Sequence, residues 1–278
     1  MIPRDFVTEW RSNAPWVADH QVEQDLVISR ALVELFSRQP IAEGLAFRGG
    51  TALYKLHLRT PARYSEDIDL VQTNQGPAGP LLDEIHDALD PWLGRPAWKQ
   101  TDGGITLNYR FLSEGLPAIP LRLKIEINTR EHISMFGPQP RHFEVSSRWF
   151  TGSCSITTFA LDELIGTKLR ALFQRKKGRD LFDLGLVLAQ HHVDPPRVVE
   201  CFQRYVRANG QRVTRAMFEQ NLAAKRADPT FAADMTPLLA NGSHWNFDHY
   251  ISLVWNELLS KLPGAPWQGS PSTGPGAP

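Results

Sequence analysis

The spacing of apolar residues predicts that the chain begins with a helix and a short strand. Residues 21–38 carry one apolar stripe at helical spacing, made by Val22, Leu26, Leu32, Val33 and Phe36. Residues 44–47 form a short strand pattern that ends at Arg48, and the glycines that follow predict a turn and then a helix from near Thr51. Residues 67–71 have the pattern of a second strand, and residues 80–93 that of an amphipathic helix.

Strand patterns dominate the middle of the chain, and helical patterns dominate the rest. Alternating apolar residues predict strands at residues 104–112, 121–130, 142–147 and 154–160. Helical periodicity broken by turn residues predicts helices at residues 161–175, 179–192, 196–210, 215–227 and 247–262. Mixed strands and helices followed by helices alone indicate an α+β fold that ends in a helical bundle. We predict an α/β domain over residues 1–157, a helical domain over residues 158–262 and a disordered tail, rich in Pro, Gly and Ser, over residues 263–278.

The overall composition narrows the class of protein without assigning a function. Of the 278 residues, 42% are hydrophobic and 22% charged, and the formal net charge is zero, so bulk charge favours neither nucleic acid nor membrane as a partner. The two cysteines, Cys154 and Cys201, lack metal-site spacing, which argues against a disulfide framework or a zinc site. The sequence shows no signal-peptide core and no apolar run of spanning length, so we expect a cytoplasmic protein without a membrane partner.

The stretch "RYSEDIDLV" places three carboxylates, those of Glu66, Asp67 and Asp69, within four residues. In a strand, Asp67 and Asp69 share one face, because successive side chains point to opposite faces. Two carboxylates on one face suit Mg²⁺, which completes its shell with water and substrate phosphate oxygens. An exposed edge strand with two solvated acids is the alternative, and for an isolated D-x-D it is the better interpretation.

The residues before this strand favour the metal site over the exposed edge strand. In "FRGGTALYKL", Gly49 and Gly50 follow a strand and precede a helix, so that backbone N–H groups can approach a phosphate at the helix start. Gly-Gly-Thr alone is weak evidence, since any tight turn could use it. The order strand, Gly-Gly-Thr, helix and D-x-D strand is specific, and it predicts a phosphate-binding turn beside a metal site.

Three further residues fit such a site, and each has a structural alternative. Glu126 lies on a predicted neighbouring strand, where it either completes a cluster of three carboxylates or forms a cross-strand ion pair. Lys168 falls inside an apolar helical stripe, so its ammonium either reaches water past a packed stem or contacts substrate phosphates. Asp180 is half-buried by its helical position, and its partner is Lys168, Arg179 or a helix amino terminus that it caps.

Together these motifs resemble a known family. The stretches "FRGGTALYKLHL", "RYSEDIDLV", "LKIEIN" and "ELIGTKLRALFQRKKGRDLFDL" run in the family's order from about residue 47 to 190. They resemble the AbiEii/AbiGii nucleotidyltransferase toxins of type IV toxin–antitoxin systems, including the MenT toxins, within the DNA polymerase beta-like superfamily. The resemblance implies a nucleotidyltransferase-type mixed sheet with flanking helices, followed by a helical bundle.

The resemblance also implies roles for individual residues. Asp67 and Asp69 would bind catalytic Mg²⁺, with Glu126 as the third acid, and the helical domain would contribute Lys168 and Asp180 to catalysis. Nucleotide binding falls to Lys168 and to the turn residues Arg48, Gly49, Gly50 and Thr51. The chain has Thr51 where Ser is common, which keeps the hydroxyl, and Glu126 where polymerases often have Asp, which gives the carboxylate a longer reach.

Some relatives transfer nucleotides from NTP to the 3′ end of tRNA and so block translation, and the resemblance implies the same here. The local charge agrees with it, because a basic cluster expected to bind RNA comprises Arg175, Lys176, Lys177 and Arg179. The alternatives are a nucleotidyltransferase that modifies a protein or a small hydroxyl compound, and a non-catalytic module that binds NTP.

A cognate antitoxin is the remaining implied partner. In some relatives the hydroxyl at the position of Ser65 can be phosphorylated by the antitoxin, which makes Ser65 a candidate regulatory residue and the antitoxin a candidate kinase. A phosphate there would add roughly one and a half to two negative charges beside the two acids and would oppose both Mg²⁺ and triphosphate binding. A turn or capping serine is the structural alternative.

Overall fold

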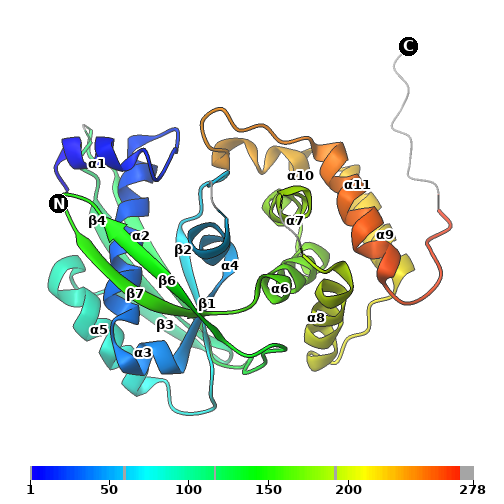
Figure 1. Ribbon diagram of the computed structural model, residues 1–278, viewed down its shortest axis with the longest axis horizontal. Coiled ribbons are helices and arrows are strands. Elements are labelled where there is room, and N and C mark those ends of the chain that lie inside the picture. The colour runs from blue at the N-terminus through cyan, green and yellow to red at the C-terminus, as the bar shows by residue number, and fades with distance from the viewer. Residues whose placement is uncertain (1, 59–60, 116, 191–192, 270–278) are drawn as a thin grey trace. The chain divides into compact units, whose positions relative to one another are not determined.

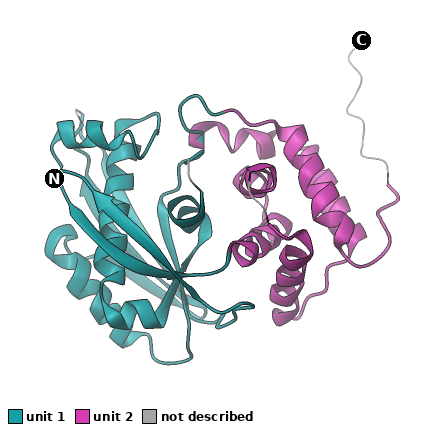
Figure 2. Ribbon diagram, in the orientation of Figure 1, with its two compact units in different colours: residues 1–160, 239–243 teal, residues 161–238, 244–278 magenta. Residues whose placement is uncertain are grey.

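The structure is a computed structural model that describes residues 2–58, 61–115, 117–190 and 193–269. It contains two compact units (Figure 2). Unit 1 comprises Met1–Ala160 with Leu239–Ser243, and unit 2 comprises Leu161–Leu238 with His244–Pro278. The division after Ala160 falls near the predicted boundary at residue 157, whereas no pattern in the sequence indicated that a short segment returns to unit 1.

Unit 1 is built on one seven-stranded mixed sheet (Figure 1). Its strands are β1 (Leu45–Arg48), β2 (Asp67–Gln72), β3 (Ala97–Thr101), β4 (Gly104–Leu112), β5 (Pro120–Asn128), β6 (Gln139–Ser146) and β7 (Thr151–Thr158). They lie in the order β3-β4-β5-β2-β1-β7-β6. Strand β2 is therefore central, parallel to β5 on one side and antiparallel to β1 on the other.

One face of this sheet is covered by helices and forms the core. The helices of unit 1 are α1 (Arg4–Trp10), α2 (Asp19–Phe36), α3 (Gln39–Gly44), α4 (Gly49–Ala52) and α5 (Gly79–Leu93), with a π-helical turn at Leu53–His57 after α4. Helices α2 and α5 pack against each other and against the sheet. Strand residues that face them are fully buried, such as Ile68, Leu123 and Ile125. Their strand neighbours on the other face are polar and half-buried or exposed, so β5 alternates throughout and β2 alternates from Asp67 to Leu70.

Some elements are not apparent from the sequence pattern. Strand β3 is exposed at every position, so no alternation of apolar residues marks it, and it forms only because β4 offers it a pairing edge. Helices α1 and α3 are only seven and six residues long, which leaves too few turns for a periodic stripe. The helix expected from near Thr51 begins at Gly49 and widens to a π-helical turn at Leu53.

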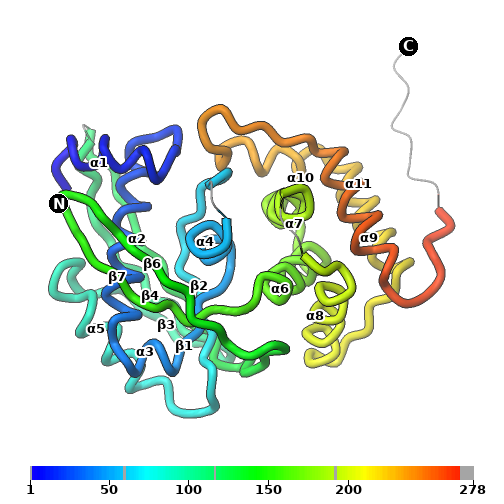
Figure 3. The backbone as a smooth tube through the Cα atoms, viewed as in Figure 1, coloured from blue at the N-terminus to red at the C-terminus, as the bar shows by residue number. Residues whose placement is uncertain are grey.

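Unit 2 consists of helices, whose path Figure 3 traces. They are α6 (Leu161–Gln174), α7 (Gly178–Gln190), α8 (Pro195–Ala208), α9 (Arg215–Arg226), α10 (Pro229–Ala233) and α11 (Phe247–Glu257). Helix α6 packs against α7 and α8, and α7 also packs against α11. In the described part of the chain, no helix combines the length and apolar character needed to cross a membrane.

The segment predicted to be a disordered tail, residues 263–278, is attached at its start. The backbone N–H of Arg215 donates to the carbonyl oxygen of Pro263 at 2.9 Å, and the N–H of Trp267 donates to Glu219 Oε2 at 2.6 Å. These contacts join the segment to α9, which a count of Pro, Gly and Ser residues does not reveal. Residues 270–278 lie outside the described residues.

Candidate active site

Asp67 and Asp69 lie at the start of the central strand β2, on the face of the sheet opposite α2 and α5. Between them, Ile68 is fully buried in the core, so the pleat directs both carboxylates to the other face. In the register of β2 and β5, Asp67 is opposite Lys124 and Asp69 is opposite Glu126. The structure therefore brings three of the predicted acids onto one face of two neighbouring strands.

Gly49 lies directly against Asp69. Its φ of +85° is one that glycine adopts without strain. A Cβ atom built on Gly49 would lie 2.0 Å from Asp69 Oδ2, so only hydrogen leaves room for the carboxylate. Arg48, the preceding residue, is opposite Asp69 in the β1–β2 register. The Gly-Gly-Thr turn thus holds Asp69 in place through close packing.

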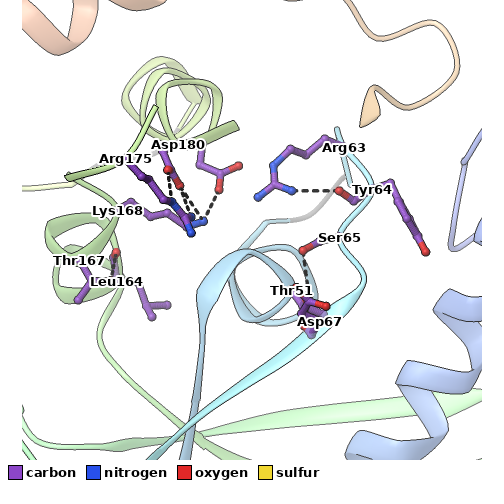
Figure 4. A network of polar contacts seen from close by, with 11 residues as sticks. Thr51, Arg63, Tyr64, Ser65, Asp67, Leu164, Thr167, Lys168, Arg175 and Asp180 are labelled. Atoms are coloured by element: carbon purple, nitrogen blue, oxygen red, sulfur yellow. Dashed lines mark hydrogen bonds and ion pairs between the residues drawn. The ribbon is translucent and has the colours of Figure 1, made fainter. Parts of the chain in front are cut away.

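Thr51 joins this turn to the residues around Asp67 (Figure 4). Its Oγ1 lies 2.6 Å from the carbonyl oxygen of Asp67 and 2.9 Å from Ser65 Oγ. Because a hydroxyl has one proton, Thr51 donates to the carbonyl and accepts from Ser65 in the arrangement that satisfies both contacts. Ser65 precedes β2, so it does not share a strand face with Asp67, and it is held by Thr51 instead.

Lys124 supplies a positive charge among the acids. Its Nζ lies 3.0 Å from Glu126 Oε1 and 3.6 Å from Asp67 Oδ2. Burial disfavours the charged lysine, but its hydrogen bond to Glu126 and the neighbouring carboxylate charges outweigh this effect and raise the pKa of Lys124. Glu126 thus forms an ion pair, which was the structural alternative to metal binding for this residue.

The two aspartates fit a divalent cation better than the third acid does. Asp67 Oδ1 is buried and has no hydrogen-bond partner among the described residues, which is costly for a carboxylate oxygen unless a cation binds there. Asp69 is held on the same face, two residues along the strand. Within the described part of the chain, no group of three or more His, Cys, Asp or Glu side chains has the geometry to hold a metal ion. The Glu126 carboxylate is paired with Lys124 instead.

A small pocket of about 260 Å³ opens beside Asp69 on the same face. Its lining includes Arg48, Glu126 and Asn128, and the glycines of the β3–β4 turn. Arg48, predicted to bind nucleotide, donates from Nη1 to Glu131 Oε2 at 2.9 Å, so its guanidinium is fixed at the edge of this pocket by an ion pair. The pocket is polar and lies next to the candidate metal site.

Sequence reasoning missed Arg63. This arginine is only 2% exposed, its Nη1 donates to the carbonyl oxygen of Tyr64 at 3.0 Å, and its guanidinium lies 5.0 Å from the centre of the Tyr54 ring. A Cβ atom on Gly50 would lie 2.4 Å from Arg63 Nη2, so Gly50 makes room for this side chain as Gly49 does for Asp69. An arginine four residues before the D-x-D stretch was the available signal.

Unit 2 contains the other two predicted catalytic residues (Figure 4). Lys168 of α6 places Nζ 2.8 Å from Asp183 Oδ2 and 3.7 Å from Asp180 Oδ1, both on α7. Both aspartates are fully buried. Asp180 also accepts two hydrogen bonds from Arg175, at 2.7 and 2.8 Å. Of the three partners expected for Asp180, Lys168 is present at 3.7 Å. Lys168 lies nearer to Asp183, which the sequence pattern did not single out, than to Asp180.

The predicted RNA-binding cluster is largely paired within unit 2. Arg175 binds Asp180, Lys176 forms an ion pair with Asp228, and Lys177 lies 3.5 Å from Asp234 Oδ1. The fourth residue, Arg179, is half-buried. These pairs reduce the net positive charge that the sequence pattern indicates.

Unit 2 contains a second buried lysine besides Lys168. Lys225 is buried, and its Nζ donates to the carbonyl oxygens of Leu172 and Phe173 at the end of α6. Burial lowers the pKa of Lys225 to about 8, against the opposing effect of the negative charge on Asp180. Its role is to cap a helix end, a role that charge counting along the sequence cannot distinguish from RNA binding.

The chain is similar to known proteins in sequence and in structure. Residues 30–252 match the family described as "Nucleotidyl transferase AbiEii toxin, Type IV TA system". A search of curated proteins by sequence finds no significant match. Among solved structures, MenT4, a nucleotidyltransferase toxin of Mycobacterium tuberculosis H37Rv, superposes with a TM-score of 0.66 at 19% identity, covering 95% of this chain and 91% of that one.

A second similar structure comes from Helicobacter pylori. The protein JHP933 matches with a TM-score of 0.55 at 17% identity, covering 86% of this chain and 90% of that one. At 19% and 17% sequence identity, the two structures show a similar fold and nothing further. The predicted α+β fold, with a mixed sheet followed by helices, is confirmed by them.

Proposed function

The chain belongs to the AbiEii nucleotidyltransferase toxin family of type IV toxin–antitoxin systems, and on that premise we propose that it transfers a nucleotide from NTP to the 3′ end of tRNA with Mg²⁺ as cofactor. The family match covers residues 30–252 and confirms the resemblance drawn from the four sequence stretches. Membership implies an NTP substrate and an antitoxin partner. A nucleotide added beyond the 3′ end would block aminoacylation, and hence translation.

The observation that carries this proposal is the pair of aspartates on β2. Asp67 presents a buried oxygen without a hydrogen-bond partner among the described residues, and Asp69 is held beside it by the close approach of Gly49. Carboxylates of this kind bind Mg²⁺ together with substrate phosphate oxygens. When bound, the cation would lower the pKa of the attacking hydroxyl and neutralise charge on the phosphates.

The other predicted residues are assigned supporting roles. We assign nucleotide binding to Arg48, Gly49, Gly50 and Thr51, since the glycine turn leaves its backbone close to the two acids and Arg48 borders the polar pocket. Glu126 is the proposed third metal ligand, a role that requires its carboxylate to leave Lys124. Lys168 is proposed to contact NTP phosphates, and Asp180 is proposed to hold its ammonium.

Two further roles extend the proposal to partners. The basic cluster of Arg175, Lys176, Lys177 and Arg179 is proposed to contact RNA, although the ion pairs of the first three lower its net charge. Ser65 is proposed as the residue through which an antitoxin with kinase activity inactivates the enzyme. Its hydroxyl is half-buried beside Thr51, two residues from Asp67.

The direct test is transfer of label from each α-³²P NTP to total tRNA in the presence of Mg²⁺. We expect label on tRNA with the wild-type protein, and none with Asp67→Asn or Asp69→Asn, because a neutral amide is a poor ligand for Mg²⁺. Glu66→Gln is the matched control, since Glu66 is the exposed acid of the same stretch, and it should keep activity. A titration with Mn²⁺, monitored through the paramagnetic signal of the ion, measures metal binding independently of turnover.

The outcomes separate the proposal from its alternatives. Label on protein or on a small hydroxyl compound, but not on tRNA, would replace tRNA as the acceptor. Binding of NTP and Mn²⁺ without any transfer would indicate a non-catalytic module. Full transfer by Asp67→Asn would refute the assignment of the metal site.

A further inference from the structure

The sheet face that carries the two aspartates also carries a pair of arginines. Arg110 of β4 is directly opposite Arg122 of β5 in the strand register, and both are exposed. Their strand neighbours Tyr109 and Leu123 are fully buried on the other face, where the Tyr109 hydroxyl donates to Asp90 of α5 at 3.0 Å. The two guanidinium groups therefore point away from α5.

This pairing is electrostatically unfavourable as it stands. Side chains directly opposite on antiparallel strands have Cβ atoms about 5 Å apart, and like charges at such positions destabilise the sheet. Among the described residues, neither Arg110 nor Arg122 has a hydrogen bond or ion pair through its side chain. By contrast, Lys124 on the same face forms an ion pair with Glu126. An anion that bridges both guanidinium groups would remove the repulsion and be held by planar, bidentate donors.

The position of the pair relates it to the candidate metal site. Along β5, residues 122, 124, 126 and 128 share this face, and Lys124 and Glu126 lie opposite Asp67 and Asp69. The arginines are thus two residues, or about 7 Å, from the level of Asp67. The pocket lined by Glu126 and Asn128 lies at the other end of the same row. The two aspartates are therefore placed between a polar pocket and a pair of arginines.

We propose that the Arg110–Arg122 pair binds a backbone phosphate of the nucleic-acid acceptor, on the side of Asp67 away from the nucleotide pocket. The inference deepens the proposed function, because it assigns the acceptor strand to a particular surface. A nucleotidyltransferase needs the acceptor hydroxyl and the NTP on opposite sides of its metal site, and the row on β5 supplies both sides. The triphosphate of NTP is the other source of phosphate, and the experiment separates the two.

The first variant is Arg110→Glu. It places a carboxylate opposite Arg122, which replaces a repulsive cross-strand pair with an attractive one, so the melting temperature should stay the same or rise. The second variant, Arg110→Gln/Arg122→Gln, removes both charges without adding an acid. The control is Arg95→Gln/Arg141→Gln, which makes the same change of charge at two exposed arginines of unit 1, one in the loop after α5 and one on the edge strand β6.

The measurement is binding of total tRNA over a range of salt concentrations, without NTP, and binding of NTP with Mg²⁺, without tRNA. We expect Arg110→Glu and the double glutamine variant to weaken tRNA binding by at least tenfold and to lower the slope of log K against log salt by about one. Binding of NTP should remain within twofold of wild type. In the transfer assay, KM for tRNA should rise while kcat is kept.

Two binding results would overturn the inference. Loss of NTP binding together with tRNA binding would assign the arginines to the triphosphate, and tRNA binding that falls no further than in the Arg95/Arg141 control would remove them from the RNA surface. The binding measurements are independent of catalysis. If the wild-type protein binds tRNA through Arg110 and Arg122 but transfers no nucleotide, the proposed function is refuted and the inference stands. If Arg110→Glu is active with an unchanged KM for tRNA, the inference is refuted and the proposed function stands.

Discussion

The Asp69 carboxylate lies so close to Gly49 that a Cβ atom there would be 2.0 Å from Asp69 Oδ2. Gly49 also has a φ of +85°, which costs a residue with a side chain about 1–2 kcal/mol. Both facts require glycine at this position. The Gly-Gly-Thr turn and the D-x-D strand, separated by fifteen intervening residues in the sequence, are therefore one packed unit.

Gly49→Ala should destabilise the fold by about 2 kcal/mol or more and abolish nucleotide transfer, because the new methyl group must displace Asp69. Gly94→Ala is the matched control, since Gly94 has a φ of +75° with nothing within 4 Å of its Cβ position. It should show the backbone cost alone and keep full activity. Thermal unfolding and the transfer assay measure the two effects, and an active Gly49→Ala protein would mean that the position of Asp69 is not critical.

Lys168 and Asp183 form a buried ion pair that can be tested as a double-mutant cycle. Lys168→Met should destabilise the protein by about 3 kcal/mol, because it removes an ammonium 2.8 Å from a fully buried carboxylate. Lys168→Met/Asp183→Asn should recover much of that stability. Neither variant should transfer nucleotide if Lys168 contacts phosphates, so recovery of transfer in the double variant would make Lys168 purely structural.

Ser65 offers a test of regulation by negative charge. Ser65→Ala loses one hydrogen bond with Thr51, costs about 1 kcal/mol and should keep substantial transfer. Ser65→Glu should be strongly impaired, because a carboxylate near Asp67 competes for Mg²⁺ and repels the triphosphate. Ser65→Gln has the size of glutamate without its charge. If it is as inactive as Ser65→Glu, bulk rather than charge is responsible, and a fully active Ser65→Glu would exclude the regulatory role.

Lys225 makes stability depend on pH in a predictable direction. Burial lowers its pKa in the folded protein to about 8 from the ordinary value of 10.5, so between these pH values the unfolded chain binds a proton that the folded chain does not. The free energy of unfolding should therefore rise from pH 8 to pH 10.5 through this residue. Urea unfolding of wild type and Lys225→Met across this range isolates the contribution, with Lys99→Met, at an exposed lysine, as the control. If the difference in free energy of unfolding between wild type and Lys225→Met stays constant over this pH range, the pKa of Lys225 is not lowered by folding.

The sequence by itself determined the elements that carry a strong local pattern. Alternation along residues 67–71 places Asp67 and Asp69 on one face of their strand, and alternation along residues 121–130 places Lys124 and Glu126 on one face of theirs. Side chains in a strand alternate whatever the rest of the fold does. The Gly-Gly-Thr turn and the order of the motifs were equally local, and they were enough to identify the family.

Only the tertiary structure decided which charged groups meet. Glu126 turns to Lys124, Asp183 lies nearer to Lys168 than Asp180 does, and Lys225 is buried at the end of α6. Each of these depends on the register of two strands or the packing of two helices, which periodicity along one segment does not contain. The same holds for Arg110 and Arg122, twelve residues apart in sequence, because the antiparallel pairing of β4 and β5 alone sets them opposite each other.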